Sequence, residues 1–293
     1  MRVIFIGTVV FSLKALQKLI EINAEVVGVC TKQGTDFNSD YADLSKTCAD
    51  NNIPCLIVDN INSKASYDWI KGLEPDIIFC FGWSSLIKKE LLMLPSMGVV
   101  GYHPAALPKN RGRHPLIWAL VLGLEESAST FFFMSEGADD GDILAQENFE
   151  IKYIDDAETL YARVIHIALK QIEDFVPKLE CNIYKRVKQN HSYANTWRKR
   201  GKSDGRIDFR MNSTAVYNLV RGLTRPYVGA HIVYSGSDVI VWKAEEVACT
   251  KRNIEPGIVL ESKAEGIFIK CQENAIRILD HEFKELPFVG EYL

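Results

Sequence analysis

His103 lies at the end of a predicted strand, a position at which parallel sheets commonly bind ligands. His103 directly follows the apolar run Val99–Tyr102. Open parallel sheets bind ligands at the carboxyl ends of their strands, and Pro104 and Pro108 stiffen the loop that follows. A histidine so placed is more often functional than a lone histidine in a core, so the sequence predicts that His103 takes part in acid–base chemistry.

The loop after His103 is polar and basic. Its segment Lys109-Asn110-Arg111-Gly112-Arg113 carries three positive charges. Ammonium and guanidinium groups bind phosphates and carboxylates, so this loop is a candidate binding site for an anionic substrate. A helix is predicted to begin at His114-Pro115, because proline suits the first turn. The candidate substrate-binding residues are Tyr102, Pro104, Lys109, Asn110, Arg111 and Arg113.

A second stretch, Glu136–Asp142, holds four acidic residues and two glycines. A solvated turn and a calcium loop are the plain alternatives, but a calcium loop of the EF-hand type needs D-x-D-x-D-G spacing and a glutamate at its twelfth position, which this segment lacks. The functional interpretation is that one carboxylate orients His103 and keeps it protonated. No zinc-ligand spacing is present, and no metal site is predicted.

The turn after the first predicted strand, Gly7–Phe11, holds one glycine and two bulky valines. A dinucleotide-binding turn needs G-x-G-x-x-G, so that backbone amides can approach a pyrophosphate. We therefore expect no NAD or FAD site here.

The elements that must position these residues form an α/β pattern in the first half of the chain. Short apolar strands alternate with helical stretches, which indicates a Rossmann-like, mostly parallel sheet covered on both faces. The predicted strands are Val3–Ile6, Val26–Cys30, Cys55–Val58, Asp76–Phe81, Val99–Tyr102 and Thr130–Met134. The predicted helices are 11–21, Tyr41–Asn52, Ser63–Lys71 with a serine cap, and Asp156–Leu179, with Asp155 or Asp156 as its cap and Pro177 at its end.

The second half has a different texture. Residues 184–205 are polar and basic and are predicted to be a linker, and a short helix follows over Ser213–Gly222. Short strands with turns between them then suggest a small OB-like β-barrel; they are His231–Tyr234, Val239–Trp242, Gly257–Glu261, Gly266–Cys271 and Ala275–Leu279. We expect a catalytic domain over residues 1–183, a basic linker over 184–205 and a C-terminal domain over 206–293.

Composition limits the class of protein. The net charge is −4, and its basic excess is confined to the predicted linker, which argues against a general polyanion binder. Seven cysteines without a C-x-x-C pair are typical of free thiols in a reducing compartment. No run approaches the roughly 18 apolar residues that span a bilayer, so a cytoplasmic protein without membrane association is expected.

The two functional stretches together resemble the formyltetrahydrofolate-dependent formyltransferase family. The pattern H-P-x-x-L-P-x-x-R-G begins at His103, and G-A-D-x-G-D-I follows about 30 residues later. The resemblance extends to the opening VIFIGT-x-x-FS and to the later I-D-F…V-Y-N-L-V-R-G-L-T-x-P-Y-x-G-A, so it covers nearly the whole chain.

This resemblance implies three catalytic positions. The family histidine falls on His103, the family aspartate on Asp139, and the family asparagine on Gly101. Loss of one oxyanion donor typically costs ~10²–10³ in rate. Three alternatives stay open: a side chain such as Asn110 or Tyr102 replaces the amide, a water replaces it, or the protein is slow, inactive or differently specialised.

The resemblance also implies the donor and its site. A neutral amine attacks the formyl carbon of 10-formyltetrahydrofolate while protonated His103, held by Asp139, stabilises the developing oxyanion. The loop after the fourth predicted strand resembles the family's folate loop, although Trp83 is equally consistent with simple packing. The implied folate-binding residues are Trp83, Ser84, Ser85, Leu86, Gly137, Ala138 and Asp140.

Two acceptors compete. The segment Thr31–Tyr41, which corresponds to a basic tRNA-binding loop in the tRNA enzyme, holds one basic and two acidic residues, which disfavours tRNA, although Lys185–Lys202 keeps it open. The run 110–116 resembles the sugar-modifying members, so a nucleotide-linked amino sugar is the favoured substrate. A catalytically impaired relative is the third alternative, and a homodimer is expected only by analogy with sugar-modifying relatives.

Overall fold

The computed structural model describes residues 1–34 and 39–293. The chain divides into two compact units. The first comprises residues 1–115, 127–149 and 162–197, and the second comprises 116–126, 150–161 and 198–293. Part of the segment 31–41, on which the expectation about a tRNA-binding loop depends, lies outside the described residues.

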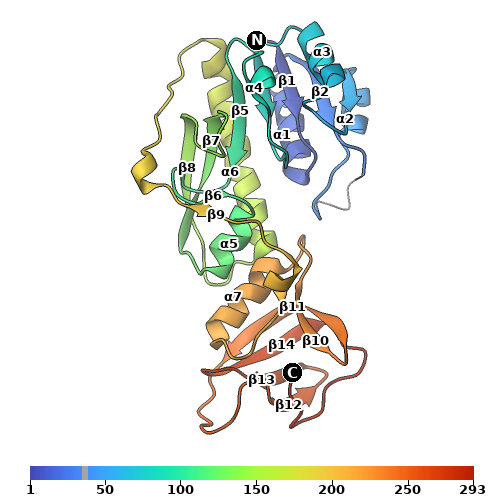
Figure 1. The fold of residues 1–293 in the computed structure, drawn as a ribbon, viewed down its shortest axis with the longest axis vertical. Coiled ribbons are helices and arrows are strands. Elements are labelled where there is room, and N and C mark those ends of the chain that lie inside the picture. Colours follow the sequence, from blue (N-terminus) through green and yellow to red (C-terminus); the bar gives the residue numbers. More distant parts are fainter. Residues whose placement is uncertain (35–38) are drawn as a thin grey trace. The chain divides into compact units, whose positions relative to one another are not determined.

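The first unit is built on a seven-stranded sheet of order β3-β2-β1-β4-β5-β7-β8 (Figure 1). Strands β1 to β5 pair in parallel and β7 pairs antiparallel to β5. The predicted α/β fold class is confirmed. The strands are β1 (Val3–Ile6), β2 (Val26–Thr31), β3 (Cys55–Ile57), β4 (Ile77–Cys80), β5 (Val99–His103), β7 (Glu126–Phe133) and β8 (Ile143–Glu150).

Helices cover this sheet because its strands are apolar on both faces. The helices of the first unit are α1 (Val10–Glu21), α2 (Ser45–Asp50), α3 (Lys64–Gly72), α4 (Lys89–Leu92) and most of α6 (Ala157–Glu180). Helix α5 (Pro115–Val121) belongs, except for its first residue, to the second unit. On one face, Phe175 of α6 contacts Phe79 and Phe131. On the other, Ile70 of α3 packs in one cluster with Ile4 of β1. Alternating side chains of a strand thus anchor opposite layers.

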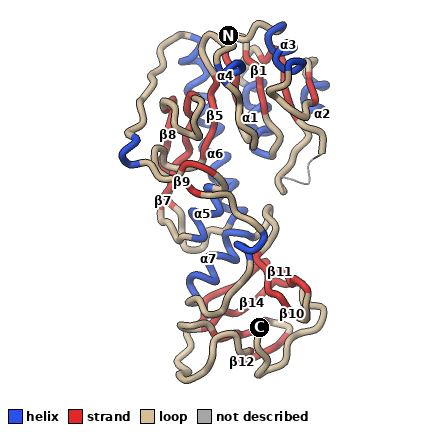
Figure 2. The backbone as a smooth tube through the Cα atoms, in the orientation of Figure 1, coloured by secondary structure: helices blue, strands red, loops and turns tan. Residues whose placement is uncertain are grey.

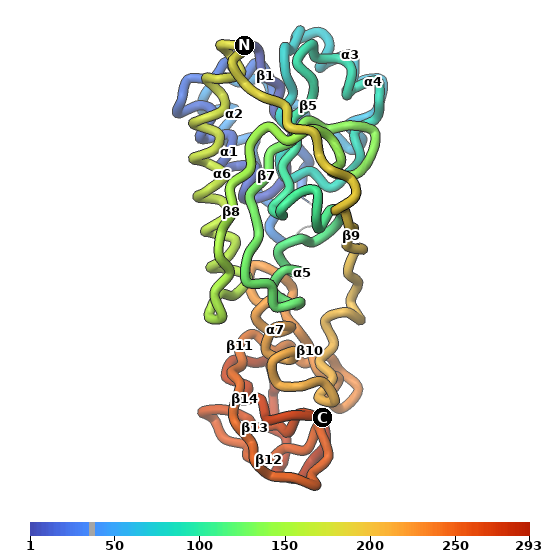
Figure 3. Tube along the Cα trace, turned by 90° about the vertical axis from the view of Figure 1, so that its left-hand side faces the viewer, coloured from blue at the N-terminus to red at the C-terminus, as the bar shows by residue number. Residues whose placement is uncertain are grey.

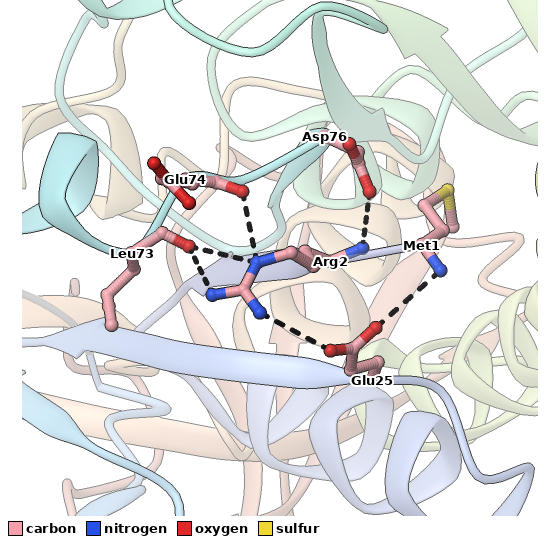
Figure 4. A network of polar contacts seen from close by, with 6 residues as sticks. All are labelled: Met1, Arg2, Glu25, Leu73, Glu74 and Asp76. Carbon is pink, nitrogen blue, oxygen red and sulfur yellow. Dashed lines mark hydrogen bonds and ion pairs between the residues drawn. The ribbon is translucent and has the colours of Figure 1, made fainter.

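Arg2 fixes the start of β1 to its neighbours (Figure 4). Its guanidinium donates to the Leu73 carbonyl at 2.8 Å, and its Nη1 lies 3.5 Å from Glu25 Oε1. Its backbone amide donates to Asp76 Oδ2 at 2.7 Å. These contacts join the amino-terminal ends of β1, β2 and β4, and so help to set the register between these parallel strands.

Several local expectations can be compared with the structure. Ser63 caps α3 by accepting from the Ser66 amide, and Asp156 accepts from the Thr159 amide at the start of α6. Helix α6 was expected over Asp156–Leu179 and spans Ala157–Glu180, so both ends agree within one residue. Pro177 lies in its last turn, and the Cys181 amide still bonds the Pro177 carbonyl at 3.0 Å, because proline lacks only its own donor.

Two elements depart further from the sequence pattern. Strand β8 was not predicted, because half of its eight residues are polar and half are exposed, as is common for an edge strand. The helix expected over Tyr41–Asn52 is confined to Ser45–Asp50.

Residues 181–197 follow α6, pass the start of the edge strand β8 and end at β9 (Figures 1 and 3). We call this segment the strap. Val187 pairs with Ile143 of β8 in both directions, with N···O distances of 2.8 and 2.9 Å. Its end forms β9 (Thr196–Trp197), which pairs in parallel with β6 (Arg111–Gly112). The basic segment is therefore bonded to the first unit over much of its length.

The second unit contains α7 (Ser213–Leu223) and an antiparallel sheet of order β10-β11-β14-β13-β12 (Figure 2). The strands are β10 (Ala230–Tyr234), β11 (Ser237–Val247), β12 (Val259–Lys263), β13 (Gly266–Lys270) and β14 (Ala275–His281). Val216 and Val220 of α7 pack in one core with Val241, Ile267 and Ile276 of this sheet. Each of the five predicted strands is present.

Candidate active site

His103 ends β5 and lies between two acceptors. Its Nε2 is 2.7 Å from the carbonyl oxygen of Asn110, and its Nδ1 is 3.6 Å from Asp139 Oδ2. The second distance is that of an ion pair and is too long for a hydrogen bond. The His103 side chain is 6% exposed and that of Asp139 is 22% exposed. His103 Nε2 therefore donates to the Asn110 carbonyl, and the Asp139 carboxylate lies within ion-pair distance of Nδ1.

Asp139, and not its neighbour Asp140, faces His103. Asp139 has a φ of +53°, which is unusual for a residue with a side chain. Its Oδ2 accepts from the Gly112 amide at 2.9 Å. The Asp140 carboxylate instead accepts from the Ser135 hydroxyl. The structure thus brings together the histidine and the aspartate that the sequence singled out.

Gly101, the position to which the resemblance assigns the family asparagine, has little room for a side chain. A Cβ on Gly101 would lie 2.9 Å from Met134 Cγ and 3.1 Å from Phe132 Cζ, both closer than ordinary contact. Residues two apart on a strand share a face, so this space lies on the face of His103. Side-chain carbon and sulfur of Met134 and Phe132 therefore crowd the point from which a side chain at position 101 would extend.

The two residues considered as replacements for the amide lie differently. The Tyr102 hydroxyl is 3.0 Å from Ser129 Oγ, and its ring contacts Phe11 at 4.3 Å between centroids. It faces the layer opposite His103, and burial raises the pKa of its phenol. Asn110 has a φ of +63° and places its backbone carbonyl oxygen 2.7 Å from His103 Nε2. Tyr102 is therefore directed away from His103, whereas Asn110 is next to it through its backbone.

The basic loop separates into one buried and two exposed cations. Arg111 is 9% exposed, and its Nη2 bonds Gln189 Oε1 at 2.6 Å and His191 Nδ1 at 3.0 Å. Its Nε is buried without a hydrogen-bond partner. Lys109 and Arg113 are exposed. Within the described part of the chain, no salt bridge involves any of these three side chains. Pro104, expected at the substrate, is half-buried beside His103.

The expected folate loop follows β4, next to β5 in the sheet, with Cys80 opposite Gly101. The Trp83 indole N–H is buried without a partner, and Lys32 Nζ lies 4.9 Å from its ring centroid. Ser84 is half-buried, whereas Ser85 and Leu86 are exposed. The Leu86 carbonyl already accepts from Asn62 Nδ2 at 2.8 Å.

The other half of the expected folate site, Gly137–Asp140, has Gly137 and Ala138 exposed. An unpartnered buried N–H beside two exposed loops suits a heterocycle that offers acceptors and donors. These residues therefore fit a folate. No group of three or more metal-ligating side chains was found among the described residues.

The backbone amides of the turn after β1 are not free to bind a pyrophosphate. Ser12 Oγ accepts from the amides of Thr8 and Val9, both at 3.1 Å, and donates to the Phe81 carbonyl at 2.6 Å. The amides that a dinucleotide-binding turn offers its ligand are thus bonded within the protein.

Three site residues were missed by the sequence analysis because they lie in the predicted linker. Gln189 Nε2 donates to the carbonyls of Asp139 at 2.8 Å and Gly141 at 2.7 Å. His191 contacts Arg111, and Asn195 Oδ1 accepts from the Asn110 amide at 2.8 Å. Gln189 is buried, whereas His191 and Asn195 are exposed, and their polar, basic surroundings gave no signal that they contact the loops around His103. The β-branched and aromatic pair of β9 was the one hint of a strand.

Comparison with known sequences agrees with these observations. The profile of the family described as Formyl transferase matches residues 1–174, and that of the Formyl transferase C-terminal domain matches residues 199–287. The methionyl-tRNA formyltransferase of Caldanaerobacter subterraneus subsp. tengcongensis is 30% identical over 300 residues, covering 100% of this chain and 96% of the relative. That of Clostridioides difficile is 28% identical over 299 residues, with the same coverage.

Solved structures share the fold. WlaRD, a sugar 3N-formyl transferase, has a TM-score of 0.71 at 20% identity, covering 97% of this chain and 99% of that chain. The N-formyltransferase of Helicobacter canadensis, in complex with folinic acid and dTDP-3-aminofucose, has a TM-score of 0.70 at 18% identity, covering 94% of this chain and 98% of that chain. On the family match and the full-length relatives, the chain belongs to the formyltransferase family, which uses 10-formyltetrahydrofolate as its formyl donor.

Proposed function

We propose that this protein transfers a formyl group from 10-formyltetrahydrofolate to the primary amine of a nucleotide-linked amino sugar. The observation that carries the proposal is Arg111. This side chain is nine-tenths buried on the loop that contacts His103, and its hydrogen-bond partners, Gln189 and His191, are not carboxylates. A buried cation without a counter-ion is unfavourable unless an anion joins it. The diphosphate of a nucleotide sugar would supply that anion.

The exposed neighbours of Arg111 extend the same argument. Lys109 and Arg113 flank it, so three cations lie within five residues at one end of the sheet. A compact dianion needs only a few such groups, and guanidinium is suited to bidentate contact with phosphate. The remaining part of the acceptor, its amine, would then lie toward His103 at the end of β5.

In the proposed reaction, the protein's own residues orient the reactants and move protons. His103 Nε2–H, bonded to Asn110 in the structure, would instead donate to the formyl oxygen as negative charge develops there. Asp139 holds the other ring nitrogen. A carbon–nitrogen bond forms to the amine, the bond to the folate nitrogen breaks, and a proton passes from the amine to the leaving nitrogen. Holding both substrates in one site supplies much of the rate.

An initiator tRNA is the second candidate acceptor. The observation that favours it is the full-length similarity to methionyl-tRNA formyltransferases. The basic stretch 184–202 also offers charges to phosphates. Several side chains of this stretch already have partners within the protein: Gln189 and Asn195 hydrogen-bond to other residues, and Lys202 pairs with Asp238. The stretch is therefore less available to RNA phosphates, and we rank the sugar nucleotide first.

The deciding experiment is a comparison of acceptors. The purified protein is incubated with 10-formyltetrahydrofolate and either dTDP-3-aminofucose, other nucleotide-linked amino sugars or charged initiator tRNA, and the release of tetrahydrofolate is followed by absorbance. Turnover with a sugar nucleotide supports the proposal. Turnover with the tRNA alone selects the second candidate. Folate binding without any turnover identifies a catalytically impaired relative, in keeping with Gly101.

A further inference from the structure

We propose that Gln189, on the strap, is a positioning residue for formyl transfer: its side-chain amide holds the backbone of the Asp139 loop against Arg111 and thereby sets the distance from Asp139 to His103. This role would apply to formyl transfer to either acceptor. Gln189 is only 6% exposed although it lies in a polar, basic segment.

The amide of Gln189 uses every one of its hydrogen-bonding groups within the site. Its Nε2 donates to the Asp139 carbonyl at 2.8 Å and to the Gly141 carbonyl at 2.7 Å. Its Oε1 accepts from Arg111 Nη2 at 2.6 Å. An amide has two donor hydrogens and a carbonyl acceptor, so one side chain fastens two loops that are distant in sequence.

Both fastened loops contact His103. Asp139 faces its Nδ1, and the loop of Arg111 begins at Asn110, whose carbonyl lies on its Nε2. Gly112 of the same loop donates to Asp139 Oδ2. Gln189 therefore closes a ring of contacts that surrounds the imidazole without touching it.

The Asp139 loop needs such support. A φ of +53° is costly for a residue with a Cβ and persists only where neighbours hold it. A Cβ added to Gly141 would lie 1.7 Å from the Phe133 carbonyl, so the chain is tightly packed on the other side of this turn. The two bonds from Gln189 lie on either side of Asp140 and thus fix the turn that carries the catalytic carboxylate.

Gln189 itself is held in place before any substrate binds. Two residues earlier, Val187 is bonded to Ile143 of β8, and after it Asn195 and β9 bond to the loop of Arg111. The side chain is thus presented by a backbone that is fixed on both sides. Preorganised support of this kind is what keeps catalytic groups within the narrow geometry that transfer requires.

A glutamate at position 189 separates the role of the donor nitrogen, which faces Asp139 and Gly141, from that of the acceptor oxygen, which faces Arg111. Gln189→Glu keeps the shape and strengthens the contact with Arg111, but it replaces the donor that faces Asp139 and Gly141 by an oxygen. If support of the Asp139 loop is the function, Gln189→Glu is as damaging as Gln189→Ala. Gln17→Glu, the same change at an exposed position of α1, is the matched control.

The experiment measures kcat and KM of Gln189→Ala, Gln189→Glu and Gln17→Glu, with their thermal midpoints. Since a misplacement of about 1 Å costs roughly 10²-fold, we expect kcat of both Gln189 variants to fall about 10- to 100-fold, with KM for 10-formyltetrahydrofolate little changed. The control keeps wild-type values. Unchanged kcat in Gln189→Ala, or a loss that follows only the fraction of unfolded protein, would overturn the inference.

A second measurement does not need an acceptor, so it separates this inference from the proposed function. The Gly112 amide, which donates to Asp139 Oδ2, is followed by hydrogen exchange, with the Phe5 amide in β1 as the reference. Faster exchange at Gly112 alone in Gln189→Ala supports the inference. Equal exchange at Gly112 in the variant and the wild type contradicts it, even if the protein proves to act on another acceptor.

Discussion

Asp139 Oδ2 lies 3.6 Å from His103 Nδ1 and 2.9 Å from the Gly112 amide, whereas the carboxylate of the adjacent Asp140 is bonded to Ser135. Two neighbouring carboxylates thus have different surroundings, and only one of them can hold the imidazole. Their separate environments give the first prediction.

We expect His103→Ala and Asp139→Asn each to abolish measurable transfer, because acid–base groups contribute roughly 10²–10⁴-fold to rates. Asp140→Asn keeps most of the activity, since its carboxylate faces away from His103. Steady-state kinetics with saturating donor provide the measurement. An essential Asp140 together with a dispensable Asp139 would reverse the assignment.

The second prediction concerns the packing at Gly101. Gly101→Asn alone destabilises the protein by about 1–3 kcal/mol, the usual cost of overpacking, because its Cβ meets Met134 and Phe132. In Gly101→Asn with Met134→Ala, the amide gains room on the face of His103, and we expect kcat to rise above that of Met134→Ala. Denaturation curves and kinetics of the three variants test this. A well-tolerated single Gly101→Asn variant would show that Met134 yields easily.

The third prediction separates the thiols. Burial raises the pKa of Cys80 to about 12, whereas Cys181 is exposed. At pH 8 a thiol with that pKa is ionised in only about one molecule in 10⁴, and the thiolate is the reactive form. Iodoacetamide at pH 8 should therefore label Cys181 and leave Cys80 unmodified until the protein is unfolded. Cys181→Ser is the control, and mass spectrometry of the peptides locates the label.

The fourth prediction is a pH dependence of stability in the second unit. Burial lowers the pKa of His281 below its ordinary 6.5, against the opposing charge of Asp280. The unfolded chain then binds this proton more tightly, so the stabilisation is complete above pH 6.5 and is lost as the pH falls below it.

His281→Asn keeps an acceptor for the Phe283 amide, which bonds His281 Nδ1 at 3.2 Å. We expect its free energy of unfolding to change less between pH 7.5 and 5 than that of the wild type, as measured by urea denaturation at about six pH values. His166→Asn, at an exposed position of α6, should follow the wild-type curve. Parallel curves for His281→Asn and the wild type would contradict the prediction.

The sequence identified the elements whose signals are local. Strand β5 and His103 were found because an apolar run ends there and a rigid loop follows, and Asp139 was selected by its place in the motif. The closing of the Gly101 space by Met134 was not predictable, since the two residues meet only through the pairing of β5 and β7.

The strap was missed for a related reason. Gln189 reaches Asp139 across 50 residues of sequence, and its neighbours have the composition of a solvated linker. Edge strand β8 has only a short apolar stretch at its start and then turns polar and exposed, and β9 is two residues long, so neither gave a clear strand signal. Contacts of this kind follow from the folded arrangement and leave no periodic pattern in the chain.

The course of the strap has a consequence for dissecting the protein. A fragment that stopped at residue 183 would retain His103 and Asp139, yet it would lack Gln189, Asn195 and the strand that pairs with Arg111. Asp139 would keep its bond to the Gly112 amide, but its loop would lose the two bonds from Gln189. If Gln189 is the positioning residue proposed above, the smallest fragment with full activity has to run through Trp197, and the last residues before the second unit are part of the catalytic unit.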